Sequence, residues 1–340
     1  MKLDFDVIIV GGGPAGLSIA SELAKHHNIL LIERGQIGHT DKSWFVPKET
    51  LVKNEELRPF ANGSVKRFLA NTFTGGKLQW ETHQDDLFPF IEGEDILNFW
   101  ANTIRTNSST ILETCSYLDH CYEDHHVTVQ TSSGAFSSKL LIDASGDNSP
   151  IRKKYNEDEP EKDYWWSVCG CIAKHNNGLS GDLKVGDYEM WKTFHSDKLC
   201  DSASLSSGRP VFEYEVLNEN TSFPLILYLT KEKQPLKEMK ETFFRILREE
   251  GTTRDFHDVE VDSLKFGWYP SGGKPSNAKE RVIFVGSSGS WTTPCGWGMG
   301  YILNNYKAYS LALSTQLKSD RLSAKDLTCI GQSRGNNEFQ

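Results

Sequence analysis

A glycine-rich turn between two apolar runs near the start of the chain constrains the fold more than any other feature. Residues 6–35 read DVIIVGGGPAGLSIASELAKHHNILLIERG, so an apolar run leads into Gly11, Gly13 and Gly16, and a second apolar run ends at Glu33. A strand, a tight turn, a helix and a second strand in this order are the setting that the G-x-G-x-x-G fingerprint requires. The sequence therefore predicts a Rossmann-like α/β fold whose first unit binds a dinucleotide.

Each position of this motif has a physical task in holding a diphosphate. Gly11 permits the turn, Gly13 lets a pyrophosphate come close to the backbone, and Gly16 lets the helix pack on the strand. The helix N-terminus adds free N–H groups and a partial positive charge. Glu33 can accept hydrogen bonds from the two ribose hydroxyls. It would repel a ribose phosphate, which argues against NADP as the bound nucleotide.

The motif by itself fits either FAD or NAD. Its location at the extreme N-terminus favours FAD, and so does the absence of a second G-x-G-x-x-G for a separate nicotinamide cofactor. We therefore expect bound FAD, with NADH or NADPH as a candidate electron donor.

Composition and charge argue against several other classes of protein. The 340 residues suffice for two lobes and a large core. The formal net charge of −9, without a block of Lys or Arg, argues against a nucleic-acid partner. No run of about 18 apolar residues exists to span a membrane, and a peripheral contact with a membrane surface stays open. Seven cysteines at irregular spacing indicate reduced thiols, a cytoplasmic protein and no metal site.

Two later segments repeat the pattern of an apolar strand followed by a turn of small residues. Residues 141–146, LIDASG, end in Ser145 and Gly146, and residues 281–289, RVIFVGSSG, place Gly286 directly after the strand. Small residues at such turns allow a cofactor to come close to the backbone. Both turns are therefore expected to take part in the FAD site.

A third glycine-rich segment opens the last long helix. Residues 293–300 read TPCGWGMG, which leaves backbone N–H groups uncovered around Gly296, Gly298 and Met299. Such groups at a helix N-terminus can face the electron-rich end of an isoalloxazine ring, where negative charge gathers on reduction. Trp44 and Trp297 each lie beside a segment expected to approach this ring, and we expect both to line the substrate pocket.

Together these motifs resemble the flavoprotein superfamily of aromatic hydroxylases, geranylgeranyl reductases, flavin halogenases and lycopene cyclases. Residues 267–275, GWYPSGGKP, are similar to a Gly- and Pro-rich run of lycopene cyclases, and residues 295–298, CGWG, stand where those enzymes carry Thr-Gly-Tyr. His39-Thr40, with Trp44-Phe45 close behind, is similar to the H-T-W-S-F segment of the bacterial cyclases. The resemblance implies a hydroxylase-type FAD-binding domain with a second, mainly antiparallel β-sheet lobe for the substrate.

The chain also departs from each branch of this superfamily. Hydroxylases carry Asp-Gly in the middle motif, which helps to recruit NADPH, where this chain has Ser145-Gly146. In the third motif they carry Gly-Asp, whereas Gly286-Ser287 is closer to the Gly-Ala of the cyclases. Halogenases need a Trp-x-Trp-x-Ile-Pro segment, and the pair Trp165-Trp166 lacks that spacing.

Lycopene cyclases place an acidic pair in a late strand to protonate their substrate. Residues 228–230, Tyr-Leu-Thr, align there and offer no carboxylate. Glu213-Tyr214-Glu215 lies one strand earlier and would put both carboxylates on one side of that strand. This pair could supply the acid, and a solvated strand face explains the pattern equally well.

We therefore expect an FAD-dependent oxidoreductase, monooxygenase-like, that acts on a small hydrophobic or aromatic substrate. One alternative is a lycopene cyclase-like flavoprotein that acts on an isoprenoid without net redox, and another is a flavoprotein that modifies a partner protein. The candidate catalytic residues are Trp44, Glu213, Tyr214, Glu215 and Trp297. The candidate cofactor-binding residues are Gly11, Gly13, Pro14, Ala15, Gly16, Glu33, Arg34, Ser145, Gly146, Gly286, Gly296, Gly298 and Met299.

The apolar patterns predict a discontinuous FAD-binding domain with the substrate lobe inserted into it. The FAD-binding domain is expected to comprise residues 1–74, 101–155 and 262–330, the substrate lobe residues 75–100 and 156–261, and a disordered tail residues 331–340. The sequence does not predict the oligomeric state.

Overall fold

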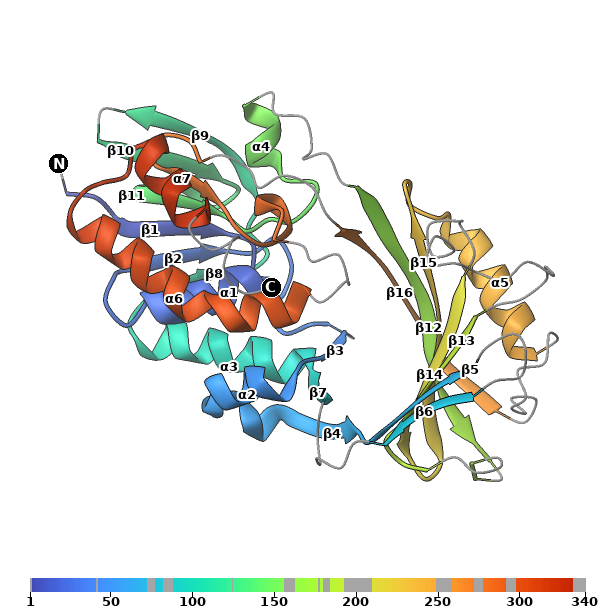
Figure 1. Ribbon diagram of the computed structural model, residues 1–340. Coiled ribbons are helices and arrows are strands. Elements are labelled where there is room, and N and C mark those ends of the chain that lie inside the picture. Colours follow the sequence, from blue (N-terminus) through green and yellow to red (C-terminus); the bar gives the residue numbers. More distant parts are fainter. Residues whose placement is uncertain are drawn as a thin grey trace.

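Two lobes share the chain, and each is built around its own β-sheet (Figure 1). Helices cover the sheet of the first lobe, and the second lobe is a long, curved sheet with a helix on its outer side. The computed structural model describes residues 2–40, 42–71, 77–81, 88–123, 125–155, 163–176, 178–179, 184–192, 210–248, 259–271, 278–291 and 298–332.

The first sheet is parallel at its centre, as a dinucleotide-binding unit requires. Its strands are β1 (Phe5–Val10), β2 (Ile29–Ile32), β8 (Thr110–Leu112), β9 (Tyr117–Glu123), β10 (His126–Thr131), β11 (Gly134–Asp143) and β17 (Val282–Phe284). β1 pairs in parallel with β2 and β11, and β11 pairs in parallel with β17. β8 pairs in parallel with β2, while β9, β10 and the first half of β11 are antiparallel.

Helices cover this sheet. They are α1 (Pro14–Leu23), α2 (Lys48–Lys53), the 3₁₀ helix η1 (Glu55–Phe60), α3 (Gly93–Thr106), α4 (Pro150–Lys154), the 3₁₀ helix η3 (Gly286–Gly289), α6 (Gly298–Lys318) and α7 (Ala324–Gln332). α1, α3 and α6 lie on one face and α4 lies on the other. Val7 and Ile9 of β1 share one core with α1, α3 and α6, whereas Ile8 and Val10 face a second core. Because both faces of β1 are buried, its sequence is a continuous apolar run. None of the helices described here is long and apolar enough to cross a membrane.

A small sheet leads from the first lobe to the second. It consists of β3 (Ser43–Phe45), β7 (Phe88–Glu92) and β4 (Ala61–Val65), in that order. β4 is followed after one residue by β5 (Arg67–Asn71), which belongs to the second sheet.

The second sheet is antiparallel apart from one pair of strands. Its order is β16 (Val259–Ser271), β12 (Tyr164–His175), β15 (Thr221–Thr230), β14 (Val211–Asn218), β13 (Asp187–Lys192), β5 and β6 (Lys77–Glu81). Only β13 and β5, among the strand pairs described for this sheet, run parallel. The predicted mainly antiparallel lobe is therefore confirmed.

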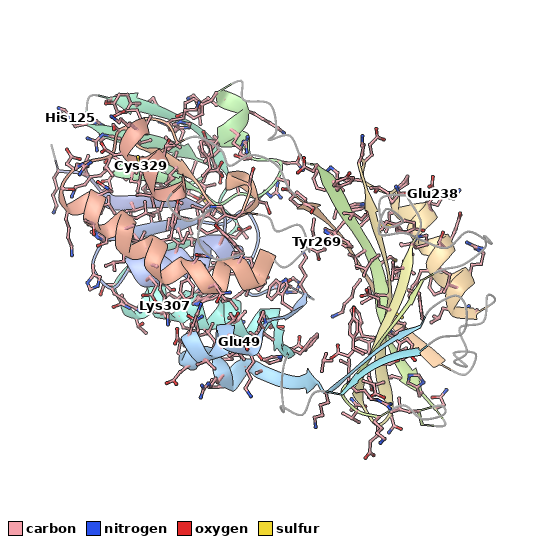
Figure 2. The ribbon with its side chains drawn as sticks, in the orientation of Figure 1. Glu49, His125, Glu238, Tyr269, Lys307 and Cys329 are labelled. Atoms are coloured by element: carbon pink, nitrogen blue, oxygen red, sulfur yellow. The ribbon has the colours of Figure 1, made fainter. Side chains whose placement is uncertain are left out.

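Helix α5 (Leu236–Arg248) covers the face of the second sheet that points away from the first lobe (Figure 1). Phe212 of β14 packs there against Met239 and Phe243 of α5. In Figure 2, Glu238 of α5 lies on this outer side, and Tyr269 of β16 lies on the side toward the first lobe. We call that second side the inner face. Because side chains alternate along a strand, every second residue of β12, β14, β15 and β16 points to the inner face.

The chain changes lobes at other residues than the sequence suggested. β5 lies in the second sheet, whereas the sequence analysis predicts residues 1–74 to belong to the FAD-binding domain. α3 packs against α1 in the first lobe, although residues 75–100 were assigned to the substrate lobe. Residues 262–271 belong to β16 and hence to the second sheet. Of the predicted tail, residues 331–332 complete α7, and residues 333–340 lie outside the described part.

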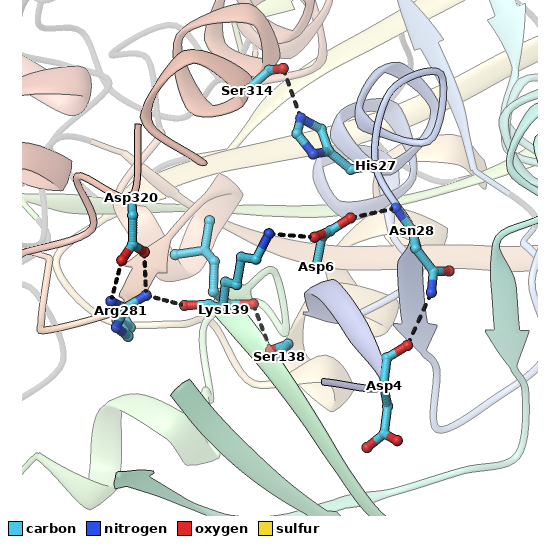
Figure 3. Close-up of polar contacts among 10 residues, drawn as sticks. Asp4, Asp6, His27, Asn28, Ser138, Lys139, Arg281, Ser314 and Asp320 are labelled. Atoms are coloured by element: carbon cyan, nitrogen blue, oxygen red, sulfur yellow. Dashed lines mark hydrogen bonds and ion pairs between the residues drawn. The ribbon is translucent and has the colours of Figure 1, made fainter. Parts of the chain in front are cut away.

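Charged side chains link the parallel strands near the start of β1 and just before β17 (Figure 3). Lys139 Nζ lies 2.8 Å from Asp6 Oδ1, and the N–H of Asn28 donates to Asp6 Oδ2 at 3.0 Å. Arg281 donates to the carbonyl oxygen of Lys139 at 3.3 Å and pairs with Asp320 at 3.0 Å. These contacts tie β1, β11 and β17 together.

Candidate functional site

The three small-residue turns predicted from the sequence meet at the carboxyl ends of β1, β11 and β17. The N–H of Ala144 donates to the carbonyl oxygen of Val10 at 2.8 Å. The N–H of Val285 donates to the carbonyl oxygen of Asp143 at 2.9 Å. In open α/β sheets, ligands bind outside the carboxyl ends of the strands. This edge is therefore the expected place for a dinucleotide.

Two glycines of the first motif are required by close packing. Gly11 has a φ of +113°, and a Cβ there would lie 2.3 Å from the carbonyl oxygen of Ala144. At Gly16 a Cβ would lie 1.9 Å from the carbonyl oxygen of Gly11. Gly286 of the third motif has a φ of +63° and sits against Ala15, whose Cβ would be 2.7 Å away. Side chains at these positions would push the three turns apart.

Gly13 differs from its neighbours because the space beside it is open. A Cβ at Gly13 would meet no atom within 4 Å. The φ of Gly13, −79°, is one that any residue can adopt. Gly13 caps helix α1, which starts at Pro14, and no side chain hydrogen-bonds to the free N–H groups of this first turn. Open space in front of an uncapped helix N-terminus fits the pyrophosphate of a dinucleotide.

Glu33 lies at the carboxyl end of β2, beside the first glycine turn. Its Oε2 accepts a hydrogen bond from the N–H of Gly12 at 2.6 Å, and its Oε1 accepts one from the N–H of Gly35 at 2.7 Å. A carboxylate has about four lone-pair sites, so both oxygens can also accept from ribose hydroxyls. Arg34, the next residue, is exposed.

A buried acid, Asp143, organises the second and third motifs, and the sequence prediction did not single it out. Its Oδ1 accepts from the N–H of Ser145 at 3.0 Å and from its Oγ at 2.5 Å, and its Oδ2 accepts from the hydroxyl of Ser149. Burial raises the pKa of Asp143, against these hydrogen bonds and the charge of Arg152. The Ser288 hydroxyl donates to the Asp143 carbonyl at 2.6 Å and so joins the two turns. The sequence does hold a signal for Asp143, since it is a single acidic residue at the end of an apolar strand.

Gly146 supports the predicted role of the second turn. It has a φ of +87°, and a Cβ there would meet nothing within 4 Å. Gly298 and Met299 begin α6, and Met299 is buried. Gly296 and Trp297 lie outside the described residues.

Trp44 lies in β3 and packs against the core of the first lobe, beside Gly93. Nearby, the Nζ of Lys42 lies 5.6 Å from the centre of the Tyr269 ring, which is a cation–π distance across the two lobes. Tyr269, on the inner face, is not among the candidate site residues of the sequence analysis. It belongs to the GWYP segment.

The predicted acidic pair lies on the inner face of the second sheet. Glu213 and Glu215 alternate with Phe212 and Tyr214, which pack under α5 on the outer side. The hydroxyl of Tyr188 in β13 donates to Glu213. Burial raises the pKa of Glu213 to about 7 and that of Glu215 to about 8. Tyr214 therefore belongs to the core, and the two carboxyls do not form a solvated strand face.

Comparison with known proteins agrees with the fold. Residues 8–164 match the family model of the pyridine nucleotide-disulphide oxidoreductases, and solved flavoprotein structures match almost the whole chain. The chain has the fold of FAD-dependent oxidoreductases. The predicted fold class is confirmed, and the predicted flavoprotein superfamily and FAD cofactor agree with these matches, among which the halogenase PltM was solved with FAD. No curated protein matches the chain.

The similar structures have low sequence identity. A geranylgeranyl bacteriochlorophyll reductase-like protein from Thermoplasma acidophilum matches with a TM-score of 0.76 and 14% identity, over 97% of this chain and 82% of that one. The halogenase PltM, in complex with phloroglucinol and FAD, matches with a TM-score of 0.69 and 11% identity, over 96% and 72%. Tetracycline destructase Tet(51) matches with a TM-score of 0.64 and 13% identity, over 96% and 87%.

Proposed function

We propose that this chain is an FAD-dependent, monooxygenase-like oxidoreductase that binds a small hydrophobic or aromatic substrate against the inner face of the second sheet. The observation that carries the proposal is the open space beside Gly13, in front of an uncapped helix N-terminus. Gly11 and Gly16 are crowded, whereas the position where a pyrophosphate would pass is clear. This difference supports a nucleotide site and not merely a tight turn.

The inner face suits an apolar substrate. Its residues alternate with the fully packed ones under α5, and several of them are only half-buried. Those half-buried residues are Trp166, Val168, Ile172, Phe223, Leu227 and Leu229. Because the pattern leaves apolar surface uncovered on the side toward the first lobe, a flat or hydrophobic molecule would gain by covering it.

The residues of the chain would bind and orient the cofactor and the substrate. FAD, when bound, would supply hydride- or oxygen-transfer chemistry. The first turn of α1 and Gly13 would hold the diphosphate, and Glu33 would hold the ribose. Tyr269 and the apolar inner face would position the substrate and exclude water.

A spectroscopic assay tests this function. Purified, FAD-loaded protein is mixed with NADH or NADPH, with and without phloroglucinol or other small phenols, while flavin absorbance and oxygen uptake are recorded. We expect substrate-dependent bleaching with oxygen consumption. Flavin that stays oxidised with every donor and substrate would contradict the proposal.

A second candidate, a lycopene cyclase-like activity, is favoured by one observation. Glu215 is a buried acid on the inner face, and its raised pKa of about 8 keeps it protonated at neutral pH. It could give a proton to a polyene, which is the step that cyclisation without net redox requires. Anaerobic conversion of an isoprenoid polyene by the reduced protein would favour this candidate. Modification of a partner protein stays a prediction that no observation favours.

A further inference from the structure

Two buried carboxyl groups stand side by side on the inner face of the second sheet. Glu213 is 6% exposed and Glu215 is 3% exposed, and both lie on β14. Tyr188 pairs in register with Glu215 on the neighbouring strand β13, and its hydroxyl donates to Glu213. The Oε2 of Glu215 is buried without a hydrogen-bond partner. A buried acceptor without a partner lowers the stability of the fold unless a hydrogen-bond donor reaches it.

Neither carboxyl forms an ion pair among the described residues. Among the side chains that the structure describes, the other ionisable groups on this face are Tyr188, Lys174 of β12 and Lys265 of β16. Lys192 of β13 pairs in register with Val211, two residues along β14 from Glu213. By register, Lys265 lies three strands from Glu213, across Leu225 and Gly170. At the usual strand spacing this is about 14 Å, too far for an ion pair. Neither carboxyl therefore has an ion-pair partner among the described contacts.

We propose that Glu213 and Glu215 bind the positively charged nitrogen of the substrate, which makes the substrate a hydrophobic or aromatic amine. The proposal rests on the proposed function, because it places the amine on the same inner face. An ammonium group has three N–H donors, and it would fill the vacant acceptor of Glu215 while also reaching Glu213. The half-buried apolar residues beside the pair, Phe223 opposite Glu215 and Leu227 opposite Val211, would cover the rest of the molecule.

Proton release is the signature of this binding mode. Burial holds the pKa of Glu215 at about 8 and that of Glu213 at about 7, so at pH 7.5 the pair retains a proton. A bound ammonium favours both carboxylates in their charged form. Amine binding should therefore release up to about one proton per molecule bound, and a neutral ligand should release none.

Calorimetric titration of the FAD-loaded protein tests the proposal. Tryptamine and 2-phenylethylamine are titrated at pH 7.5 in phosphate and in Tris, two buffers with different heats of ionisation, beside the matching alcohols tryptophol and 2-phenylethanol. We expect the amines to bind at least about tenfold more tightly than the alcohols, with proton release. Equal affinities, no proton release, or no saturable binding of either amine would overturn the proposal.

Variants locate the site. Glu215→Gln keeps the shape of the side chain and should weaken amine binding about tenfold or more, with loss of proton release. Glu219→Gln, an exposed change in the hairpin after β14, is the matched control and should bind like the unmodified protein. An unchanged affinity in Glu215→Gln would overturn the proposal. The titration measures binding without turnover. A negative redox assay would therefore contradict the proposed function without deciding whether the amine binds to Glu213 and Glu215.

Discussion

Single residues around the first turn divide into those that protect the fold and one that leaves room for a ligand. Gly11, Gly16 and Gly286 are crowded by neighbouring backbone or side-chain atoms, and Gly13 is not. This division follows from the geometry of a βαβ turn, in which the helix start must lie close to the strand while the phosphate site stays clear. Folding and cofactor binding can therefore be separated by mutation.

Gly13→Val should abolish FAD retention while the protein stays folded. The added side chain would occupy the pyrophosphate's place, and the φ of −79° imposes no strain. FAD absorbance after gel filtration and a urea titration measure the two effects. Gly134→Val is the converse control: with a φ of +129° in a hairpin far from the site, it should cost ~1–3 kcal/mol of stability and retain FAD. Stoichiometric FAD in Gly13→Val would show that the phosphates lie elsewhere.

Glu33→Ala should weaken FAD binding by ~1–3 kcal/mol, because charge-assisted hydrogen bonds to the ribose are lost. Equilibrium titration of the FAD-depleted protein measures the change. Glu113→Ala is a control, since Glu113 likewise accepts a backbone hydrogen bond, from Ile37 at 2.7 Å, and lies on a nearby exposed loop. If the two variants bound FAD equally well, Glu33 would have no part in the site.

Glu215 should make stability depend on pH. Its pKa is raised from 4.5 to about 8, so between these values the folded state holds a proton that the unfolded state has released. Stability should therefore fall as pH rises through this range and level off above it. We expect Glu215→Gln to remove ~2–4 kcal/mol of this loss between about pH 5 and pH 9, measured by urea unfolding at each pH. Identical curves for Glu215→Gln and the control Glu219→Gln would contradict this.

At the scale of the element, the contact between α1 and the turn after β1 sets how closely the helix approaches the sheet. Gly16→Ala would place a methyl group 1.9 Å from the carbonyl oxygen of Gly11, so helix and turn must separate. We expect a loss of ~1–3 kcal/mol in stability together with weaker FAD binding. Chemical denaturation measures it, with Glu22→Ala in the same helix expected to stay within about 0.5 kcal/mol. A Gly16→Ala protein as stable as this control would refute the close packing.

Elements whose signals are local could be predicted from the sequence. The β1–α1–β2 unit follows from apolar runs and glycine spacing within some thirty residues, and the structure has it there. The strand alternation of β14 also placed Glu213 and Glu215 on one side. The same alternation puts Tyr214 on the other side, under α5. The two-residue period of the strand therefore argues against Tyr214 as a catalytic residue.

On the scale of the whole molecule, sequence reasoning assigned chain segments to lobes less well, because strand pairing joins distant residues. β5 pairs with β13, about 120 residues later, and nothing in the sequence of residues 67–71 indicates that partner. The apolar face of α3 would suit either lobe, and only its contact with α1 decides. Which face of the second sheet is left toward the first lobe likewise depends on the packing of α5 against the other face, which the sequence does not encode locally.

The central claim is that this fold binds FAD at the carboxyl ends of β1, β11 and β17, and fluorescence titration of FAD-depleted protein tests it most directly. We predict saturable uptake of one FAD per chain, with the Gly13→Val protein, folded by the same urea assay, taking up none. Folded unmodified protein that fails to bind FAD, or equal binding by the two proteins, would contradict the account.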